Sequence, residues 1–278
     1  MTEDSPFRFF AAHVLRSRRL SPTMTRVTLG GEELTAFASG GRDQSFSLFL
    51  PHPGQKEPVV PVTAQEGWFA AWRAMDPAVR AVMRSYTVRE QRTERGEVDV
   101  DFALHGDDGP AARWAARCAP GDRVLLLGPA VSDNKAVGFR LPPGAGWTLL
   151  AGDETALPAI AGILRDLPPD HRTRVWIETP DAADRVTLPT RARADTTWLV
   201  RELGATHGEL LLDAVRAEPF PGGAPYAWIA GEAAMVRSLR RHLVRERELP
   251  RSAVAFTGYW RRGASEEELR EEALRAAS

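Results

Sequence analysis

The chain has 278 residues, of which 43% are hydrophobic and 26% charged, the composition of a globular protein long enough for two domains. Its formal net charge of −1 excludes a globally basic surface, so we expect no nucleic-acid or membrane partner. One cysteine, Cys118, excludes an internal disulfide and is too few for a structural zinc or iron–sulfur cluster. We expect no bound metal, and any redox chemistry must use a cofactor.

The first half of the chain is predicted to be antiparallel β-structure. Short apolar runs between turn formers predict strands at 24–29, 46–50, 85–89, 98–104 and 123–127. Along 98–104, apolar residues alternate with polar or small ones, which is typical of a strand with one packed face. Helices are predicted at 67–83 and 110–119. Strands at such intervals indicate a barrel or sandwich.

A change of pattern marks a boundary at 141–146, Leu-Pro-Pro-Gly-Ala-Gly, which predicts one domain over 1–141 and another over 147–278. Beyond it, predicted strands and helices alternate, which indicates an α/β domain with a mostly parallel, nucleotide-binding sheet. The strands are at 147–151, 174–178, 196–200, 226–230 and 253–259, and the helices at 155–167, 207–218 and 232–248. Ser265 and Glu268 form a capping-box pattern that opens a last helix.

The first motif with chemical meaning is Arg84-Ser85-Tyr86-Thr87, on a predicted strand. Arg84 and Tyr86 project to the same side, because side chains alternate along a strand. An arginine neutralises a pyrophosphate, and a tyrosine ring packs against an aromatic ring system. A strand that merely exposes an arginine would show the same four residues.

A second motif follows in residues 101–115, where a strand, a glycine-bounded turn and a helix with Pro110 at its first position succeed one another. The free amides and dipole of a helix N-terminus form a phosphate site, and Gly109 permits close approach of a phosphate. A plain strand–turn–helix joint capped by Asp107 or Asp108 is the alternative. Together with the Arg84 strand, the motif favours the pyrophosphate site of a flavin.

Two further motifs lie at predicted strand ends of the second domain. Gly152-Asp153-Glu154-Thr155 follows an apolar strand, where open α/β sheets bind ligands, although its carboxylates would repel a phosphate. They suit ribose hydroxyls, a nicotinamide amide or a flavin edge, or else Asp153 and Thr155 only cap the helix. Near the end of the chain, Tyr259, Trp260, Arg261 and Arg262 suit a flavin or an anionic, aromatic ligand, or pack the terminal helix.

Taken in order, these motifs resemble those of siderophore-interacting proteins, FAD-dependent ferric-siderophore reductases of the ferredoxin-reductase-like superfamily, over nearly the whole chain. The resemblance implies a six-stranded antiparallel flavin-binding β-barrel followed by an NAD(P)H-binding α/β domain. It also implies reduction of siderophore-bound Fe(III) to Fe(II). Since the N-terminal residues Met1–Pro6 lack the apolar core of a signal peptide, we expect a cytoplasmic protein, and we expect a monomer.

The resemblance also assigns site residues. Those expected to bind FAD or the nucleotide are Arg84, Ser85, Tyr86, Thr87, Asp101, His105, Gly109, Pro110, Ala111, Ala112, Trp114, Asp153, Glu154, Thr155, Tyr259 and Trp260. Basic candidates for the anionic ferric siderophore are Arg42, Lys56, Arg261 and Arg262. We expect no catalytic side chain, because the flavin carries the chemistry.

Several choices remain open at this point. Arg185 suits the 2′-phosphate of NADPH, whereas Glu178 suits the free ribose of NADH, so either nucleotide is compatible. The alternatives to a siderophore reductase are a general NAD(P)H–flavin oxidoreductase with another electron acceptor, and a non-catalytic siderophore- or nucleotide-binding module.

Overall fold

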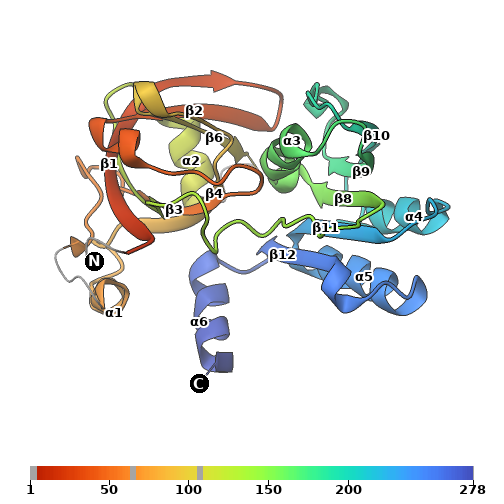
Figure 1. Ribbon diagram of the computed structural model, residues 1–278. Helices are drawn as coiled ribbons and strands as arrows, with labels where there is room; N and C mark the ends of the chain where they lie inside the picture. The colour runs from red at the N-terminus through yellow and green to blue at the C-terminus, as the bar shows by residue number, and fades with distance from the viewer. Residues whose placement is uncertain (1–4, 63–66, 105–108, 278) are drawn as a thin grey trace. The chain divides into compact units, whose positions relative to one another are not determined.

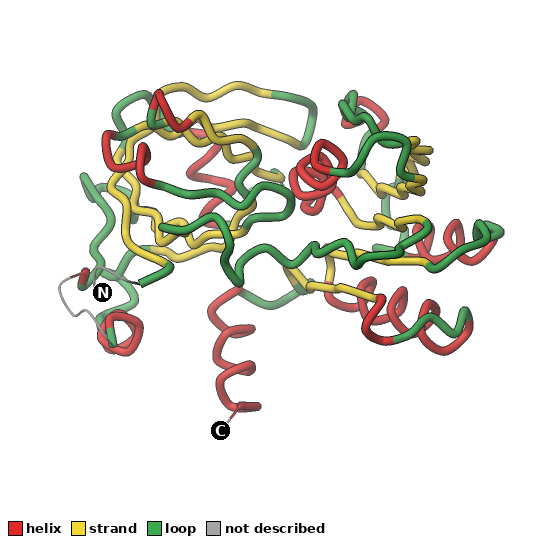
Figure 2. Tube along the Cα trace, viewed as in Figure 1, coloured by secondary structure: helices red, strands yellow, loops and turns green. Residues whose placement is uncertain are grey.

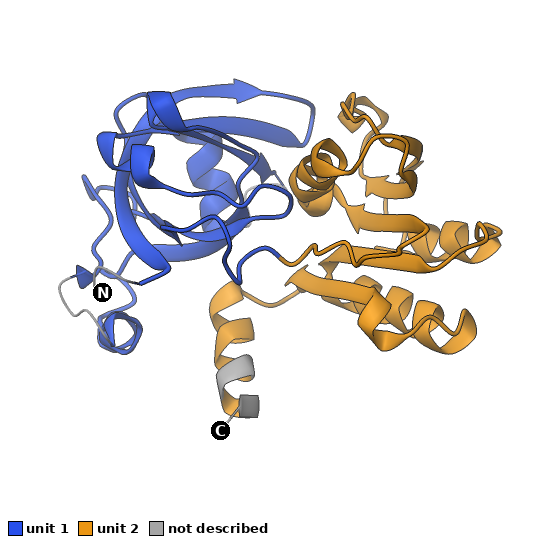
Figure 3. Ribbon diagram, viewed as in Figure 1, with its two compact units in different colours: residues 1–137 blue, residues 138–278 orange. Residues whose placement is uncertain are grey.

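The structure, a computed structural model, describes residues 5–62, 67–104 and 109–277 (Figure 1). It divides the chain into two compact units, residues 1–137 and 138–278 (Figure 3). This division lies a few residues before the boundary predicted at 141–146. Within the described residues, no helix has both the length and the apolar character needed to cross a bilayer.

The first unit is built on an antiparallel sheet with the order β4-β3-β7-β1-β2-β6-β5. It curls so that β4 packs against β6 (Figure 1). Its strands are β1 (Phe7–Arg19), β2 (Met24–Gly30), β3 (Ser45–Leu50), β4 (Val82–Thr87), β5 (Glu90–Arg92), β6 (Glu97–Ala103) and β7 (Arg123–Pro129). The predicted antiparallel fold is confirmed. The described residues hold seven strands rather than six, because the short β5 adds an edge.

Two helices belong to this unit. The helix predicted at 67–83 is only α1 (Trp68–Ala74), since Pro77 disfavours helical backbone at the residue before it and β4 begins at Val82. The second is α2 (Pro110–Arg117), which packs against β2, β4 and β6. Its buried residues Ala111 and Ala115 join the core of the curled sheet.

The second unit is a five-stranded parallel sheet with the order β10-β9-β8-β11-β12 (Figure 1). Figure 2 shows its strands in yellow and its helices in red. Its strands are β8 (Trp147–Asp153), β9 (Arg172–Thr179), β10 (Arg193–Val200), β11 (Pro225–Glu232) and β12 (Val254–Trp260). Its helices are α3 (Leu157–Asp166), α4 (Glu209–Ala217), α5 (Ala233–Arg241), which a π-helical turn extends over His242–Glu246, and α6 (Glu266–Ala277). The predicted alternation of strands and helices is confirmed.

Helices cover both faces of this sheet. Along β8, Leu150 packs in the cluster that contains α3, whereas Leu149 and Ala151 pack in the cluster that contains α4 and α5. The chain runs from β8 outward to β9 and β10 and then returns to β11 on the other side of β8. The gap between the carboxyl ends of β8 and β11 is therefore the switch point, where sheets of this kind bind ligands.

Candidate functional site

In the first unit, the predicted flavin strand is β4, an edge strand of the sheet. Arg84 and Tyr86 are half-buried, Ser85 is exposed and Thr87 is buried. The Tyr86 ring lies 4.4 Å from the Phe102 ring, and the Trp114 ring of α2 lies 5.8 Å from the Phe102 ring, measured between centroids. Aromatic packing thus links β4, β6 and α2 into one support.

The N-terminus of α2 is built from small residues. Gly109 has extended backbone and no side chain to cap the helix, Pro110 lies at its start, and Ala111 and Ala112 follow. Among the described residues, the first turn of α2 carries no acidic side chain. Within the part of the chain that the structure describes, a Cβ built on Gly109 would meet only the Cβ of Ala112, at 3.9 Å.

These residues fit the pyrophosphate and ring of FAD. Helix amides and an arginine are the donors that suit a phosphate pair, and the half-buried Tyr86 offers a ring face. Arg84, Tyr86, Gly109 and Ala112 are the residues that would hold the cofactor. His105, Asp107 and Asp108 lie outside the described residues.

In the second unit, Asp153 at the end of β8 is the centre of a hydrogen-bond network. Its Oδ1 accepts hydrogen bonds from the backbone N–H and hydroxyl of Thr155. Its Oδ2 accepts from His207 Nε2 at 3.1 Å, the Glu232 backbone N–H at 2.8 Å and Trp260 Nε1 at 3.0 Å. The side chain of Asp153 is fully buried, so these donors replace water.

The network sets the proton affinities of its members. Burial opposes ionisation of Asp153, but hydrogen bonds from His207 and Thr155 outweigh it and hold its pKa below the ordinary value. Burial likewise opposes protonation of His207, but the bond to Asp153 raises the His207 pKa overall. Burial, together with the charge of Asp153, raises the pKa of Glu154 to about 7.

Glu178, at the end of β9, is also fully buried and serves the N-terminus of α4. Its Oε1 accepts from the Gly208 backbone N–H at 3.0 Å and Arg201 Nη1 at 2.7 Å, and its Oε2 accepts from the Leu211 N–H at 3.3 Å. Arg201 also lies 3.5 Å from Glu154 Oε1. The sequence leaves Glu178 open as a contact for a nucleotide ribose; here its carboxylate already has these partners within the second unit, and the ribose role stays a prediction.

The N-terminus of α5 is closed in the same way. Glu232 Oε2 accepts hydrogen bonds from the backbone N–H groups of Ala234 at 2.6 Å and Met235 at 2.9 Å. Asp153 caps the 3₁₀ turn η4 (Glu154–Ala156), which leads into α3. Carboxylates therefore bind amides at the starts of α4 and α5, and Asp153 does the same for the turn that precedes α3.

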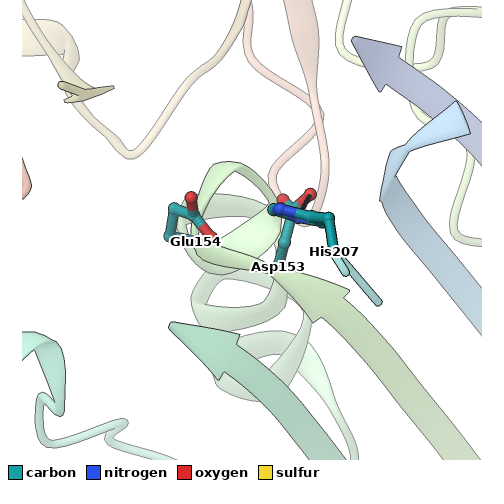
Figure 4. Close-up of side chains that lie close together, drawn as sticks. All are labelled: Asp153, Glu154 and His207. Carbon is teal, nitrogen blue, oxygen red and sulfur yellow. Dashed lines mark hydrogen bonds and ion pairs between the residues drawn. The ribbon is translucent and has the colours of Figure 1, made fainter. Parts of the chain in front are cut away.

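Asp153, Glu154 and His207 also form a group in which one ligand atom from each lies within 4.8 Å of the others, close enough for a metal ion. Figure 4 shows His207 directed at Asp153, with Glu154 extending to the other side. The carboxylate of Asp153 already accepts five hydrogen bonds, three of them on Oδ2. A carboxylate saturated by donors has no lone pair for a metal, so hydrogen bonding explains this group.

Comparison with known proteins decides the family. Residues 13–133 match the siderophore-interacting FAD-binding domain, and residues 145–263 match the siderophore-interacting protein domain. The ferric vibriobactin reductase ViuB of Vibrio cholerae is 32% identical over 260 residues, which are 93% of this chain and 91% of that protein. The NADPH-dependent ferric-chelate reductase of Escherichia coli is 30% identical over 91% of this chain and 93% of that one.

The chain belongs to the siderophore-interacting protein family. Solved structures agree: the siderophore-interacting protein SipS from Aeromonas hydrophila superposes with a TM-score of 0.79 at 30% identity, covering 98% of this chain and 99% of that one. A ferredoxin reductase of carbazole 1,9a-dioxygenase, at 17% identity, covers 92% of this chain and 71% of that one, with a TM-score of 0.61, and shows the fold alone. The predicted family, ferredoxin-reductase-like fold and FAD-binding domain are confirmed.

Other predicted site residues of this siderophore-interacting protein have partners inside their own units. Asp101 accepts a hydrogen bond from Arg26 Nε at 2.6 Å and lies 3.7 Å from Arg89 Nε. Arg261 makes two 2.7 Å hydrogen bonds to Glu272 of α6. The cofactor role of Asp101 and the substrate role of Arg261 stay predictions. A ligand bound to either side chain would compete with the contact described here.

The remaining candidates are placed as follows. Tyr259 is half-buried and packs on the core beside α3, and Arg262 is exposed next to Arg261. In the first unit, Lys56 is exposed on the connection after β3, and Arg42 adopts left-handed backbone with φ 53° in the turn before that strand. Their substrate roles also stay predictions.

Sequence reasoning missed His207, Arg201 and the capping role of Glu232. His207 was assigned only to the start of a helix, and its partner Asp153 lies 54 residues earlier. The available signal was position: Arg201, His207 and Glu232 all follow predicted strands, at the edge where polar residues of a parallel sheet meet.

Proposed function

We propose that this siderophore-interacting protein is an FAD-dependent NAD(P)H:ferric-siderophore reductase that acts in the cytoplasm, reducing siderophore-bound Fe(III) to Fe(II) and so freeing the iron. The observation that carries the proposal is the start of α2, built from small uncharged residues, together with Arg84 and Tyr86 on β4, the strand that packs against this helix, all within the matched FAD-binding domain. The named activities of the ferric vibriobactin reductase and the ferric-chelate reductase support the same reaction class.

The residues of the first unit bind and orient the cofactor. The α2 amides and Arg84 neutralise its pyrophosphate, and Tyr86, supported by Phe102, supplies a ring face. When bound, FAD converts a two-electron hydride donor into single electrons for Fe(III). The protein needs no side-chain nucleophile for this reaction.

The second unit binds the electron donor at the carboxyl edge of its parallel sheet. Since the amides of α4 and α5 are used by Glu178 and Glu232, side chains rather than helix N-termini hold the phosphates of the nicotinamide nucleotide. Arg185 is exposed after the η5 turn (Ala182–Asp184) that follows β9 and is available for a phosphate. Arg42, Lys56, Arg261 and Arg262 are the cationic candidates for the anionic siderophore.

The test is a reductase assay with defined acceptors. The purified protein is examined for flavin absorbance, with and without added FAD. NADH or NADPH oxidation is then followed with a ferric tris-catecholate or ferric hydroxamate complex and a chromogenic Fe(II) chelator. We expect nucleotide oxidation to depend on the ferric complex and Fe(II) to appear. A protein that binds no FAD, or that oxidises the nucleotide equally without the ferric complex, contradicts the proposal.

A further inference from the structure

The carboxylate of Asp153 does more than cap a helix turn. A cap needs only the Thr155 N–H, 2.9 Å from Oδ1. The second oxygen, Oδ2, instead gathers donors from three other places in the chain: His207 before α4, the Glu232 N–H of β11 and the Trp260 indole of β12. One fully buried anion thus fixes two rings whose own positions are more than 50 residues apart in sequence.

The two rings held by Asp153 form a pair. The His207 and Trp260 rings lie 4.9 Å apart between centroids with an interplanar angle of 89°, an edge-to-face contact. Unlike Asp153, both residues are partly exposed. Two partly exposed rings, an indole and an imidazole, therefore lie together at the carboxyl edge of the sheet.

The position of this pair is that of a ligand site. Asp153 ends β8 and accepts a hydrogen bond from the end of β11, so it lies at the switch point between these strands. Gly231, whose φ is +133°, leaves room for the Asp153 carboxylate, since a Cβ at this position would lie 2.6 Å from Asp153 Oδ2. Any other residue at 231 would displace the carboxylate.

We propose that Asp153 is a positioning residue of the reductase: it holds the His207 and Trp260 rings in one orientation as the surface on which the nicotinamide nucleotide of the electron donor binds. This inference rests on the proposed function. An indole face packs against a flat nicotinamide or adenine ring, and an imidazole N–H binds a phosphate or ribose oxygen. Asp153 itself, enclosed by five donors, does not touch the nucleotide.

The charges around His207 are consistent with this role. The groups that act on it are Asp153, Glu154 and Arg201, and the Asp153 bond raises its pKa in spite of burial and Arg201. Asp153→Asn therefore removes the counter-ion of the imidazole together with the oxygen that accepts its hydrogen bond.

The test combines spectroscopy with kinetics on the FAD-loaded protein. In ¹H–¹⁵N spectra, the Trp260 indole signal is identified by its loss in Trp260→Phe, and the His207 ring signals by their loss in His207→Gln. In Asp153→Asn, we expect the indole signal to move and the His207 titration midpoint to fall by at least about one pH unit. We expect KM for the nucleotide at pH 7 to rise at least about tenfold, with kcat within about threefold.

Asp181→Asn is the matched control. Asp181 Oδ1 accepts from the Ala183 N–H at 2.8 Å, the same local cap that Asp153 makes, but Asp181 is exposed. This variant should move neither signal and leave KM unchanged. Unmoved indole and His207 signals in Asp153→Asn overturn the positioning role, and moved signals with an unchanged KM overturn the nucleotide-binding role.

Two further variants keep the test decisive if Asp153→Asn does not fold. His207→Gln and Trp260→Phe remove one ring each while keeping the buried anion, and each should raise KM about three- to tenfold. An unchanged KM in both overturns the inference. Failure of the proposed function is distinct: the unmodified protein would then bind no FAD or would oxidise the nucleotide equally without the ferric complex, while the spectra would still decide whether Asp153 orients the pair.

Discussion

The N-terminus of α2 in the first unit and those of α4 and α5 in the second are built from opposite chemistry. Helix α2 begins with a glycine, a proline and two alanines and carries no acidic side chain in its first turn, among the residues described. The amides of α4 and α5 are instead bound by the carboxylates of Glu178 and Glu232.

Every helix N-terminus attracts an anion, because its amides lack partners and its dipole is positive there. A carboxylate of the chain itself occupies these amides permanently. Small uncharged residues instead leave the amides available to a bound phosphate. The first unit is thus suited to retain a tightly bound pyrophosphate cofactor. In the second unit, the amides of α4 and α5 stabilise the fold instead of binding a phosphate. The resulting weaker binding suits a substrate nucleotide that must leave after each turnover.

The strongest test of this difference between the helix N-termini places a carboxylate at the start of α2. In Gly109→Asp, the extended backbone accepts a side chain and the space around a Cβ is open, so the variant should fold. Aspartate at this position caps the helix and repels the flavin pyrophosphate. We expect the Kd for FAD, measured by flavin fluorescence quenching, to rise about 1000-fold, equivalent to about 4 kcal/mol.

Gly109→Ser is the matched control, since serine also caps the helix but brings no charge. It should retain FAD within about tenfold, while both variants raise the thermal midpoint of the apoprotein. If aspartate and serine weaken FAD equally, the effect is steric and the open-helix argument is wrong.

The second unit is tested by removing one of its caps. Glu178→Ala takes away the anion bound to Arg201 and to two amides at the start of α4. Because this leaves the half-buried guanidinium with only its 3.5 Å contact to Glu154 and leaves the two amides unpaired, we expect a loss of about 3 kcal/mol in urea unfolding followed by tryptophan emission. The exposed Glu209, in the first turn of the same helix, provides the control, since Glu209→Ala should cost less than about 1 kcal/mol.

Glu154 makes the carboxyl edge of the second unit sensitive to pH. Its pKa of about 7 in the folded protein lies above the ordinary 4.5, so the folded state holds this proton more tightly than the unfolded state. Stability contributed by the protonated group is complete below about pH 4.5 and is lost as pH rises through 7. Between pH 5 and 8 the unfolding free energy of the protein should therefore include a fall of about 2 kcal/mol that Glu154→Gln lacks.

Urea unfolding at both pH values, with exposed Glu202→Gln as control, measures this difference. A Glu154→Gln variant with the same pH dependence as the unmodified protein would show that another group titrates in this range.

Much of this fold could be predicted from the sequence, because local patterns determine it. The alternation of Val98, Val100 and Phe102 predicts β6, and the alternation of strands and helices after residue 147 predicts the parallel sheet. The helix predicted at 67–83 was too long. The apolar pattern continues past Pro77, but the helix itself ends at Ala74. The strand β1 was not identified among the predicted strands, because its polar residues interrupt the apolar alternation.

The candidate site was predicted less completely, for a different physical reason. Arg84, Tyr86 and Gly109 lie in short contiguous motifs, so their chemistry can be inferred locally. The network around Asp153 joins residues 153, 207, 232 and 260, and only the order of the strands brings them together. Glu178 was a candidate for a ribose contact because its place at a strand end is visible in the sequence, whereas the helix whose amides bind its carboxylate is not.

The smallest expected effect concerns the carboxylate at the start of α5 and its influence on nucleotide binding. In Glu232→Gln, the amide oxygen still accepts from the N–H groups of Ala234 and Met235, but the negative charge at the start of α5 is gone. If carboxylates in the second unit weaken phosphate binding, KM for NADPH should fall about three- to tenfold, about 1 kcal/mol, with FAD affinity unchanged. KM measured at low and high salt separates the causes: an electrostatic gain shrinks with salt, whereas a changed backbone does not. An unchanged KM at low salt would mean that the phosphates bind away from α5, with Arg185 as the next position to substitute.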